Sequence, residues 1–319
     1  QQRKFSSADK NGGKNMILTV NGEILPEELG ITMCHEHLAV DLSPVRGDKD
    51  SDFDDSSLII DELNKMKQYG VKSVVEVSCN DMGRDVKKLQ MYSKACGIHI
   101  IAATGFYLAE YHTQKVRESN AEELCDIFCK DILEGIDDTG VKAGVIGEVA
   151  SGEPQMRPSE KNVLTAAAMA GKKTGVAVTT HCQLGKLAQE QIEIFEQQGM
   201  DLTKVVLGHL DLANDRDYYE KILKTGVNIG FDTIGKTAYL SDEQRADNLL
   251  WLIERGWEKQ IVLSQDISRK SYLSRGGKYS GYMTVMKDFV PLLRARGIKQ
   301  ETLNRFLIEN PARIFDKAD

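Results

Sequence analysis

Hydrophobic and polar positions follow two alternating patterns along most of the chain. Short runs rich in β-branched residues, such as 72–78, are typical of strands. Longer stretches with apolar residues every three or four positions are typical of helices. The predicted strands cover 30–37, 72–78, 98–104, 143–149, 176–181, 204–209, 227–231 and 260–266. The predicted helices cover 58–69, 81–96, 121–135, 159–175, 187–199, 215–226, 242–256, 283–297 and 300–315.

This alternation of strand and helix indicates an α/β fold. Eight strands in this order, with no linker rich in Pro or Ser, predict a single (β/α)8 TIM barrel over residues 16–319. An open doubly wound sheet is the alternative. It is disfavoured because no Gly-x-Gly-x-x-Gly motif follows the first predicted strand. The polar, Asp-rich loop at 41–57 is long and is expected to lie over one end of the barrel.

The first fifteen residues are polar and rich in Lys, Ser, Gly and Asn. They have no apolar region of the kind a signal peptide requires. Met16 opens an apolar run and would be a natural start. We therefore expect residues 1–15 to be a disordered or cloning-derived lead.

Charge and cysteine content exclude several classes of protein. The net charge is −7 and the pI is about 5.5, so general binding to nucleic acid or to anionic membranes is not expected. No apolar run is long enough to cross a membrane. The six cysteines are scattered through apolar segments, which favours buried free thiols and a cytoplasmic location.

Histidines and carboxylates gather at the predicted strand ends. The first strand ends in His35-Glu36-His37, and the spacing of two puts both imidazoles on one face of a strand. Glu36 is then expected to face the barrel wall and to be structural. Later strands end in Glu148, His181, His209 and Asp266. In a TIM barrel these ends face one shared cavity, where the chemistry takes place.

Two divalent metal ions explain this set of residues most economically. Buried carboxylates are costly unless they are paired or bind a metal. Imidazole with carboxylate suits Zn²⁺ best, with Mn²⁺, Co²⁺ or Fe²⁺ as alternatives. One metal is expected on His35, His37 and Asp266, and the other on His181 and His209, with Glu148 between them.

This ligand pattern resembles the amidohydrolase superfamily. The flanking segments 32–38, 206–211, 265–270 and 309–311 resemble its phosphotriesterase-like branch, and the resemblance spans 16–315. Better-known members bridge the metals with a carboxylated lysine, whereas the matching position here is Glu148. Lys142 is too early on its strand to reach the cavity.

The resemblance implies a hydrolase. A hydroxide bridging two metals is a nucleophile at neutral pH. Asp266 is expected to take its proton and pass it to the leaving group. Tyr107, after the third strand, is expected either to stabilise the developing oxyanion or to form an aromatic wall.

The loop after the eighth strand is basic in an otherwise acidic protein. Loops seven and eight of such barrels often bind phosphate. A substrate phosphate is therefore expected on Lys236, Arg275, Lys278 and Tyr279, with a solvated loop as the alternative. Relatives include hydrolases of phosphorylated sugar lactones, so the resemblance favours a pentonic acid lactone 5-phosphate as the small-molecule substrate. Relatives are often homodimers.

Other functions remain open from the sequence. The same site could hydrolyse an amide, an N-acyl-homoserine lactone or a phosphotriester. A metal-binding scaffold without activity would be expected to lack a ligand, and none is missing. An oxidoreductase barrel is disfavoured because no flavin or nicotinamide signature is present.

Overall fold

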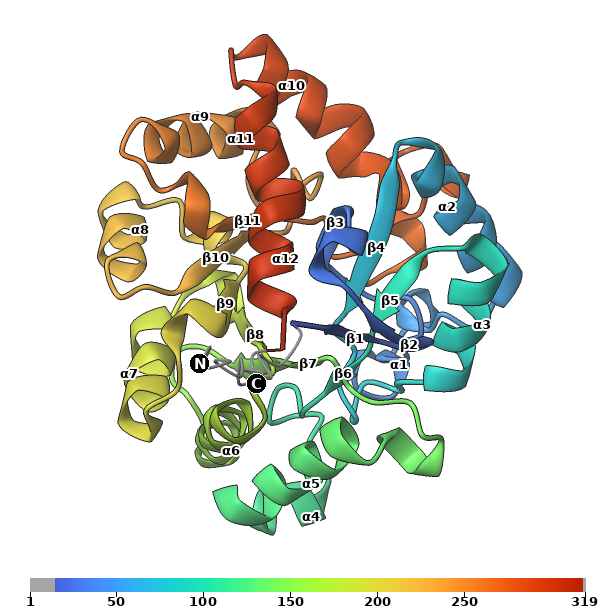
Figure 1. The fold of residues 1–319 in the computed structure, drawn as a ribbon, viewed down its shortest axis with the longest axis vertical. Coiled ribbons are helices and arrows are strands. Elements are labelled where there is room, and N and C mark those ends of the chain that lie inside the picture. Colours follow the sequence, from blue (N-terminus) through green and yellow to red (C-terminus); the bar gives the residue numbers. More distant parts are fainter. Residues whose placement is uncertain (1–14, 318–319) are drawn as a thin grey trace, which may run out of the picture.

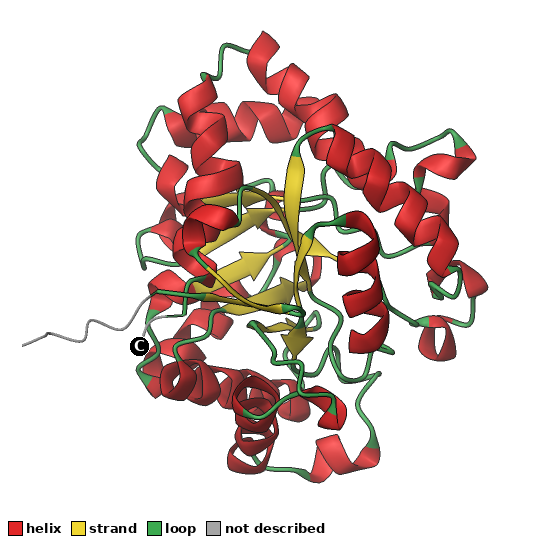
Figure 2. Cartoon of the chain, turned by 45° about the vertical axis from the view of Figure 1, so that its right-hand side comes forward, coloured by secondary structure: helices red, strands yellow, loops and turns green. Residues whose placement is uncertain are grey.

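Parallel strands lie at the centre of the molecule and helices surround them (Figures 1 and 2). The computed structural model describes residues 15–317, so nearly all of the predicted lead lies outside the described residues. The central strands are β3 (Ile31–Glu36), β4 (Val71–Glu76), β5 (His99–Ile101), β6 (Ala103–Thr104), β7 (Val145–Ser151), β8 (Val178–Cys182), β9 (Val205–Gly208), β10 (Asn228–Phe231) and β11 (Ile261–Leu263).

The strands form a (β/α)8 barrel, which confirms the predicted fold. β3 to β5 pair in sequence order, and β6 to β11 do the same. β5 and β6 are the two halves of the third predicted strand, interrupted at Ala102. The first and last strands meet where the backbone N–H of His35 donates to Ser264 Oγ at 3.0 Å.

The outer helices occupy the predicted places, often with shorter bounds. They are α2 (Ser56–Gln68), α3 (Val86–Cys96), α5 (Ala121–Leu133), α6 (Pro158–Thr174), α7 (Ala188–Gln198), α8 (Arg216–Leu223), α9 (Asp242–Ile253), α10 (Val290–Ala295), α11 (Gln300–Asn304) and α12 (Asn310–Phe315). Helix α3 begins five residues later than predicted, because Asp85 caps it by accepting hydrogen bonds from Lys87 N and Lys88 N. The last two predicted helices each contain a π-helical turn, at 285–289 and 305–309.

The shorter elements lie outside the barrel wall. A hairpin of β1 (Ile17–Thr19) and β2 (Gly22–Ile24) comes first. The loop at 41–57 contains the short helix α1 (Ser43–Arg46), and α4 (Gln114–Glu118) precedes α5. No helix in residues 15–317 is both long and apolar enough to cross a membrane.

The barrel interior has its own small core, separate from the larger core beneath the helices. It contains apolar side chains from all around the barrel, among them Cys34, Val75, Ile101, Val145, Val206 and Val262. Ile17 and Phe315 pack against them, and α12 crosses this end of the barrel in Figure 1. Because this end is plugged, a cavity can open only at the C-terminal ends of the strands.

All six cysteines are free thiols, as predicted, and five of them are buried.

Candidate metal centre

The six predicted metal ligands meet at the C-terminal ends of the strands. All are buried, and the most exposed, His181, shows 9% of its surface. We call this group the floor cluster: His35, His37, Glu148, His181, His209 and Asp266.

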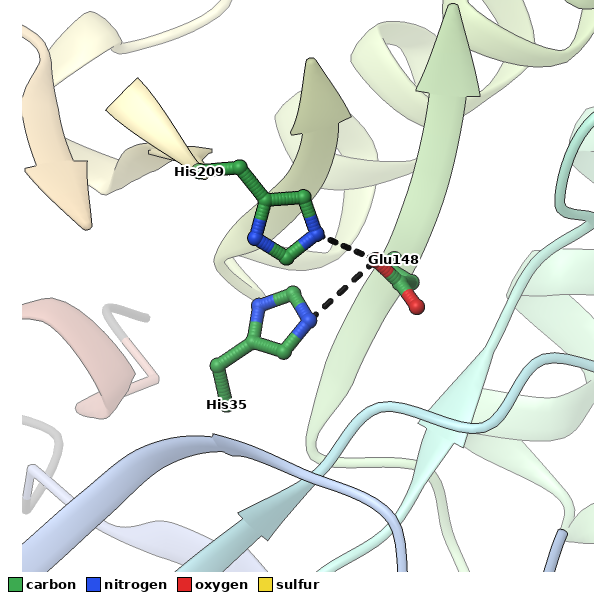
Figure 3. Close-up of side chains that lie close together, drawn as sticks. All are labelled: His35, Glu148 and His209. Carbon is green, nitrogen blue, oxygen red and sulfur yellow. Dashed lines mark ion pairs between the residues drawn. The ribbon is translucent and has the colours of Figure 1, made fainter. Parts of the chain in front are cut away.

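The Glu148 carboxylate lies at the middle of the floor cluster. Its Oε2 is 3.2 Å from His35 Nε2, 3.1 Å from His181 Nδ1 and 3.5 Å from His209 Nε2. Its Oε1 is 3.2 Å from His37 Nε2. Figure 3 shows the imidazoles of His35 and His209 both facing this carboxylate. The Glu148 carboxylate thus lies among four imidazoles, and its role as a bridge between two metals stays a prediction.

Two overlapping sets of residues have the geometry to hold a metal ion. The first is His35, His37 and Asp266, which is the predicted first site. The second is His35, Glu148 and His209, in which His35 stands where His181 was predicted. His181 is nevertheless close, with its Nδ1 2.9 Å from His209 Nε2.

The donor atoms fit divalent metal. Both ring nitrogens of His35 are buried and make no hydrogen bond of good geometry among the described residues, although carboxylate oxygens of Glu148 and Asp232 lie 3.2 and 3.5 Å away. An unsatisfied buried imidazole is costly, and a metal ion would satisfy it. Its neighbours supply only imidazole nitrogens and carboxylate oxygens, the ligands preferred by Zn²⁺ and similar ions.

Strand pairing is irregular in two of the strands that carry residues of the floor cluster. The pairing of β3 with β4 shifts between Met33 and Glu36, and the pairing of β7 with β8 shifts between Ile146 and Val149. Bulges of this kind redirect side chains next to active sites. The first shift explains how Cys34 joins the inner core while the adjacent His35 also points inward.

Two glycines precede ligands because no side chain would fit. A Cβ on Gly147, whose φ is +120°, would lie 1.9 Å from the carbonyl oxygen of Thr179. A Cβ on Gly208 would lie 2.1 Å from that of Thr180. Neighbouring backbones therefore pack directly against the residues before Glu148 and His209.

Two ligands have the left-handed backbone conformation that non-glycine residues rarely adopt. His209 has φ of 61° and Asp266 has φ of 48°. Such conformations cost about 1–3 kcal/mol and persist only where the surroundings impose them. Buried carboxylates hold both: His209 N donates to Asp232 Oδ1 at 2.9 Å, and Asp266 N to Glu36 Oε1 at 3.3 Å.

Glu36 has the structural role that was expected. Its carboxylate accepts hydrogen bonds from Ser264 Oγ at 2.5 Å, Gln265 Nε2 at 2.8 Å and Ile267 N at 3.0 Å. Burial raises the pKa of Glu36, although these hydrogen bonds oppose the rise. The residue therefore ties the end of β3 to the segment after β11.

Sequence reasoning missed Asp232, which orients two floor imidazoles. Its Oδ1 is 2.8 Å from His209 Nδ1, and its Oδ2 is 3.5 Å from His35 Nδ1. Carboxylates behind metal-bound histidines fix the ring orientation and raise ligand basicity. The signal was available, because Asp232 directly follows the seventh predicted strand.

Two other imidazoles are held in a similar way. His37 Nδ1 lies 3.0 Å from Ser78 Oγ, which donates to Glu76 Oε1 at 2.5 Å. His181 Nε2 lies 2.7 Å from Gln183 Oε1. In each imidazole, the ring nitrogen named here makes this hydrogen bond, and the other ring nitrogen faces the floor cluster.

The floor cluster favours a protonated His37 beside an ionised Glu148. Burial alone would lower the pKa of His37, but hydrogen bonds to Asp266 and Glu148 raise it to about 10. Burial opposes ionisation of Glu148, yet the charge of His35 and the hydrogen bonds from His181 and His209 bring its pKa well below the usual value. Metal ions would compete with these protons.

A cavity of about 270 Å³ opens above the floor cluster. Tyr107 lines it, with its hydroxyl 3.3 Å from His181 Nδ1. Lys236 also lines it and contacts Asp266 Oδ2. The loop at 41–57 does lie over this end, as predicted, and it contributes Leu42 and Arg46 to the cavity wall.

The four residues predicted to bind phosphate do not all line the cavity, and phosphate binding by this set stays a prediction. Lys278 Nζ lies 5.0 Å from the Tyr279 ring, and Lys236 Nζ lies 5.4 Å from the Tyr272 ring. Only Lys236 lines the cavity, whereas Arg275 and Lys278 are exposed outside it. Tyr279 packs against Tyr272, with ring centroids 5.2 Å apart.

The Asp-rich loop neutralises other cations of the basic loop. Arg269 pairs with Asp48 at 3.1 Å, and Lys270 with Asp54 at 2.9 Å. The charge excess that suggested a phosphate site is therefore smaller in the folded protein than in the sequence.

The model of the Phosphotriesterase family matches residues 15–315. The chain belongs to this family. The family match agrees with the resemblance seen in the motifs.

Similar proteins of this family come from distant organisms. The phosphotriesterase homology protein of Escherichia coli is 35% identical, over 90% of this chain and 98% of that protein. Its crystal structure, described as carrying phosphate in the active site, superposes with a TM-score of 0.88 and covers 90% of this chain and 99% of that one. The structure of a lactonase from Listeria monocytogenes gives a TM-score of 0.90 at 27% identity, over 95% of this chain and 100% of that one.

A third relative has a different named activity. The N-acetyltaurine hydrolase of Danio rerio is 30% identical, over 94% of this chain and 97% of that protein. Together with the floor cluster, the family identifies this phosphotriesterase-family protein as a metal-dependent hydrolase.

Proposed function

We propose that this hydrolase opens the ring of a sugar lactone that carries a phosphate, using two divalent metals, most suitably Zn²⁺. The observation that supports it best is the floor cluster, five of whose six side chains form sets that could hold a metal ion, beneath a cavity lined by cations. The volume of about 270 Å³ suits a small metabolite. Similarity to a lactonase and to a protein with phosphate in its active site supports both parts of the proposal.

Bound metals would generate a nucleophilic water at neutral pH and polarise the lactone carbonyl. His35, His37 and Asp266 would hold one ion, and His181 and His209 the other, with Glu148 shared. Attack forms a new bond between the carbonyl carbon and the water oxygen, and the ring C–O bond then breaks. The product is a hydroxy acid.

Asp266 is suited to move the proton in this reaction. Its Oδ1 lies 3.2 Å from His37 Nε2, while its Oδ2 contacts Lys236 on the cavity side. A carboxylate that faces both the metal ligands and the substrate can take the proton of the attacking water. It can then deliver that proton to the ring oxygen that leaves.

Tyr107 is suited to hydrogen-bond an oxygen of the substrate. Burial raises the pKa of its phenol well above the usual value, so the hydroxyl keeps its proton at neutral pH. Its position 3.3 Å from His181 Nδ1 puts this donor beside the metal ligands. We assign it the stabilisation of the developing oxyanion.

A second candidate is hydrolysis of an N-acyl amide that carries an anionic group. The similarity to N-acetyltaurine hydrolase favours it, and the same cationic cavity suits its substrate. Here the C–N bond would break and the amine would need the proton from Asp266.

The decisive experiment measures hydrolysis by protein loaded with Zn²⁺. Pentonic acid lactones with and without a 5-phosphate, together with N-acetyltaurine, are followed by pH indicator or amine release. We expect turnover of the phosphorylated lactone with a higher kcat/KM than its unphosphorylated partner. Activity on N-acetyltaurine alone would favour the second candidate. If neither lactone were hydrolysed, the first candidate would be refuted. A cytoplasmic location and a homodimer stay predictions.

A further inference from the structure

Three cationic side chains line the cavity above the floor cluster, and two of them are neutralised. Lys236 contacts the Asp266 carboxylate, and Arg269 is 3.1 Å from Asp48 and 3.7 Å from Asp50. The third, Arg46, is half-buried and has no carboxylate within 4.0 Å among residues 15–317. Its positive charge is therefore the one most available to a ligand.

The position of Arg46 also leaves most of its hydrogen-bonding capacity unused. It ends helix α1, on the loop after β3, and its Nη1 donates to the carbonyl of Ser268 at 3.2 Å. A guanidinium has five N–H donors, and beside the bond to Ser268 the Arg46 side chain also hydrogen-bonds Tyr111, which leaves donors for a ligand. The contact holds the Arg46 side chain between the loop after β3 and the loop after β11.

A row of rings connects Arg46 to the floor cluster. Arg46 interacts electrostatically with Tyr111 and Tyr107. The rings of these two tyrosines are 5.1 Å apart, and Tyr107 is in turn 5.0 Å from the His181 ring. A small substrate lying along this wall would reach from the guanidinium to the metal ligands.

We propose that Arg46 binds the anionic group of the substrate, a phosphate or sulfonate, while the bond to be cleaved lies over the floor cluster. This inference rests on the proposed hydrolase function and makes Arg46 a specificity-determining residue. The planar fork of a guanidinium matches two oxygens of such an anion. Arg275 and Lys278 are exposed and do not line the cavity, so Arg46 is the better placed of these cations.

The test compares Arg46→Gln with the matched control Lys287→Gln, at an exposed lysine outside the cavity, both loaded with Zn²⁺. For Arg46→Gln we expect KM for a pentonic acid lactone 5-phosphate to rise about tenfold to a hundredfold, the usual loss of a charge-assisted hydrogen bond. The unphosphorylated lactone should keep its kcat/KM within about twofold, because the metal ligands are untouched. Arg46→Lys should recover part of the loss, and Lys287→Gln should match the unmodified protein on both lactones.

A binding measurement separates this inference from the proposed reaction. Titration calorimetry with a pentonic acid 5-phosphate, the hydrolysed acid, does not require turnover. Weaker binding by Arg46→Gln at unchanged metal content supports the inference even if neither lactone is hydrolysed, an outcome that would refute only the reaction. Unchanged binding of this acid, or an equal loss on both lactones, would overturn the role of Arg46.

Discussion

The floor and the rim of the cavity are built in different ways. The floor cluster comes from the ends of five strands, and buried groups such as Asp232 and Glu36 hold its residues in place. The rim, which we define as Arg46, Lys236, Arg269 and Tyr272, comes from loops. Its contacts include partly exposed ion pairs such as Arg269 with Asp48. We therefore expect the strand ends to determine the reaction and the loops to determine the choice of substrate.

The largest effect is expected from Glu148→Gln. The amide cannot replace a carboxylate that lies within 3.5 Å of four imidazoles. We expect metal content to fall to one equivalent or less and kcat to drop about a thousandfold or more for every substrate, because the activated water is lost. Elemental analysis and lactone hydrolysis measure both.

The control for this substitution is Lys142→Gln, on the same segment but exposed and outside the cavity. It should keep metal and activity. If Glu148→Gln impaired only phosphorylated substrates, the division between floor and rim would be wrong.

A smaller loss is expected from Asp232→Asn, which leaves the metal ligands present but poorly oriented. Residues behind metal-bound histidines typically contribute about 10- to 100-fold to metal affinity or activity. We expect a loss of that size, equal for phosphorylated and unphosphorylated lactones. Metal titration and kcat/KM on both substrates test it, with the exposed Glu243→Gln on α9 as control. A loss confined to one substrate would contradict the assignment.

Metal binding should release protons and strengthen with pH. In the metal-free protein His37 has a pKa of about 10, so it is protonated at pH 7 and must lose a proton to bind metal. Each proton released would make the affinity up to about tenfold higher per pH unit at pH values below about 10, the pKa of His37. Calorimetry of Zn²⁺ binding in buffers of different ionisation enthalpy measures the protons released. A pH-independent affinity would show that the imidazole is already neutral.

The smallest effect is expected at the rim, from Asp48→Asn combined with Asp50→Asn. Removing both carboxylates frees Arg269 for the cavity, so KM for a phosphorylated lactone should fall by about two- to fivefold at low salt, since partly exposed pairs are worth at most about 1 kcal/mol. The unphosphorylated lactone should show no change. A rise in KM for both substrates would mean that these pairs hold the loops in shape rather than balance charge.

The sequence predicted the floor far better than the rim. His35, His37, Glu148, His181 and Asp266 lie at strand ends, and strand ends are readable from hydrophobic periodicity. The bulges in β3 and β7 that aim two of these residues were not predicted, because a register shift leaves no mark in composition.

The rim escaped prediction for a physical reason. Arg275 and Lys278 add positive charge to the loop and so suggested a phosphate site. A sequence does not show which side chains of a loop face inward. The sequence also gives no sign that Lys270 pairs with Asp54, because the two residues are more than 200 positions apart in the chain. Arg46 was not predicted because it lies in the Asp-rich loop at 41–57, whose composition is acidic.

The carboxylate of Glu36 has a consequence for how the protein matures. It joins the first barrel strand to the segment after the last one, the segment that carries Asp266. Domains fold as units while the chain emerges from the ribosome, N-terminal part first. During synthesis, His35 and His37 are made early. Asp266, the third residue of their set, is made only after most of the barrel. Complete metal capture would therefore mark the end of folding, and a chain stalled before β11 would lack the first of the two metal sites.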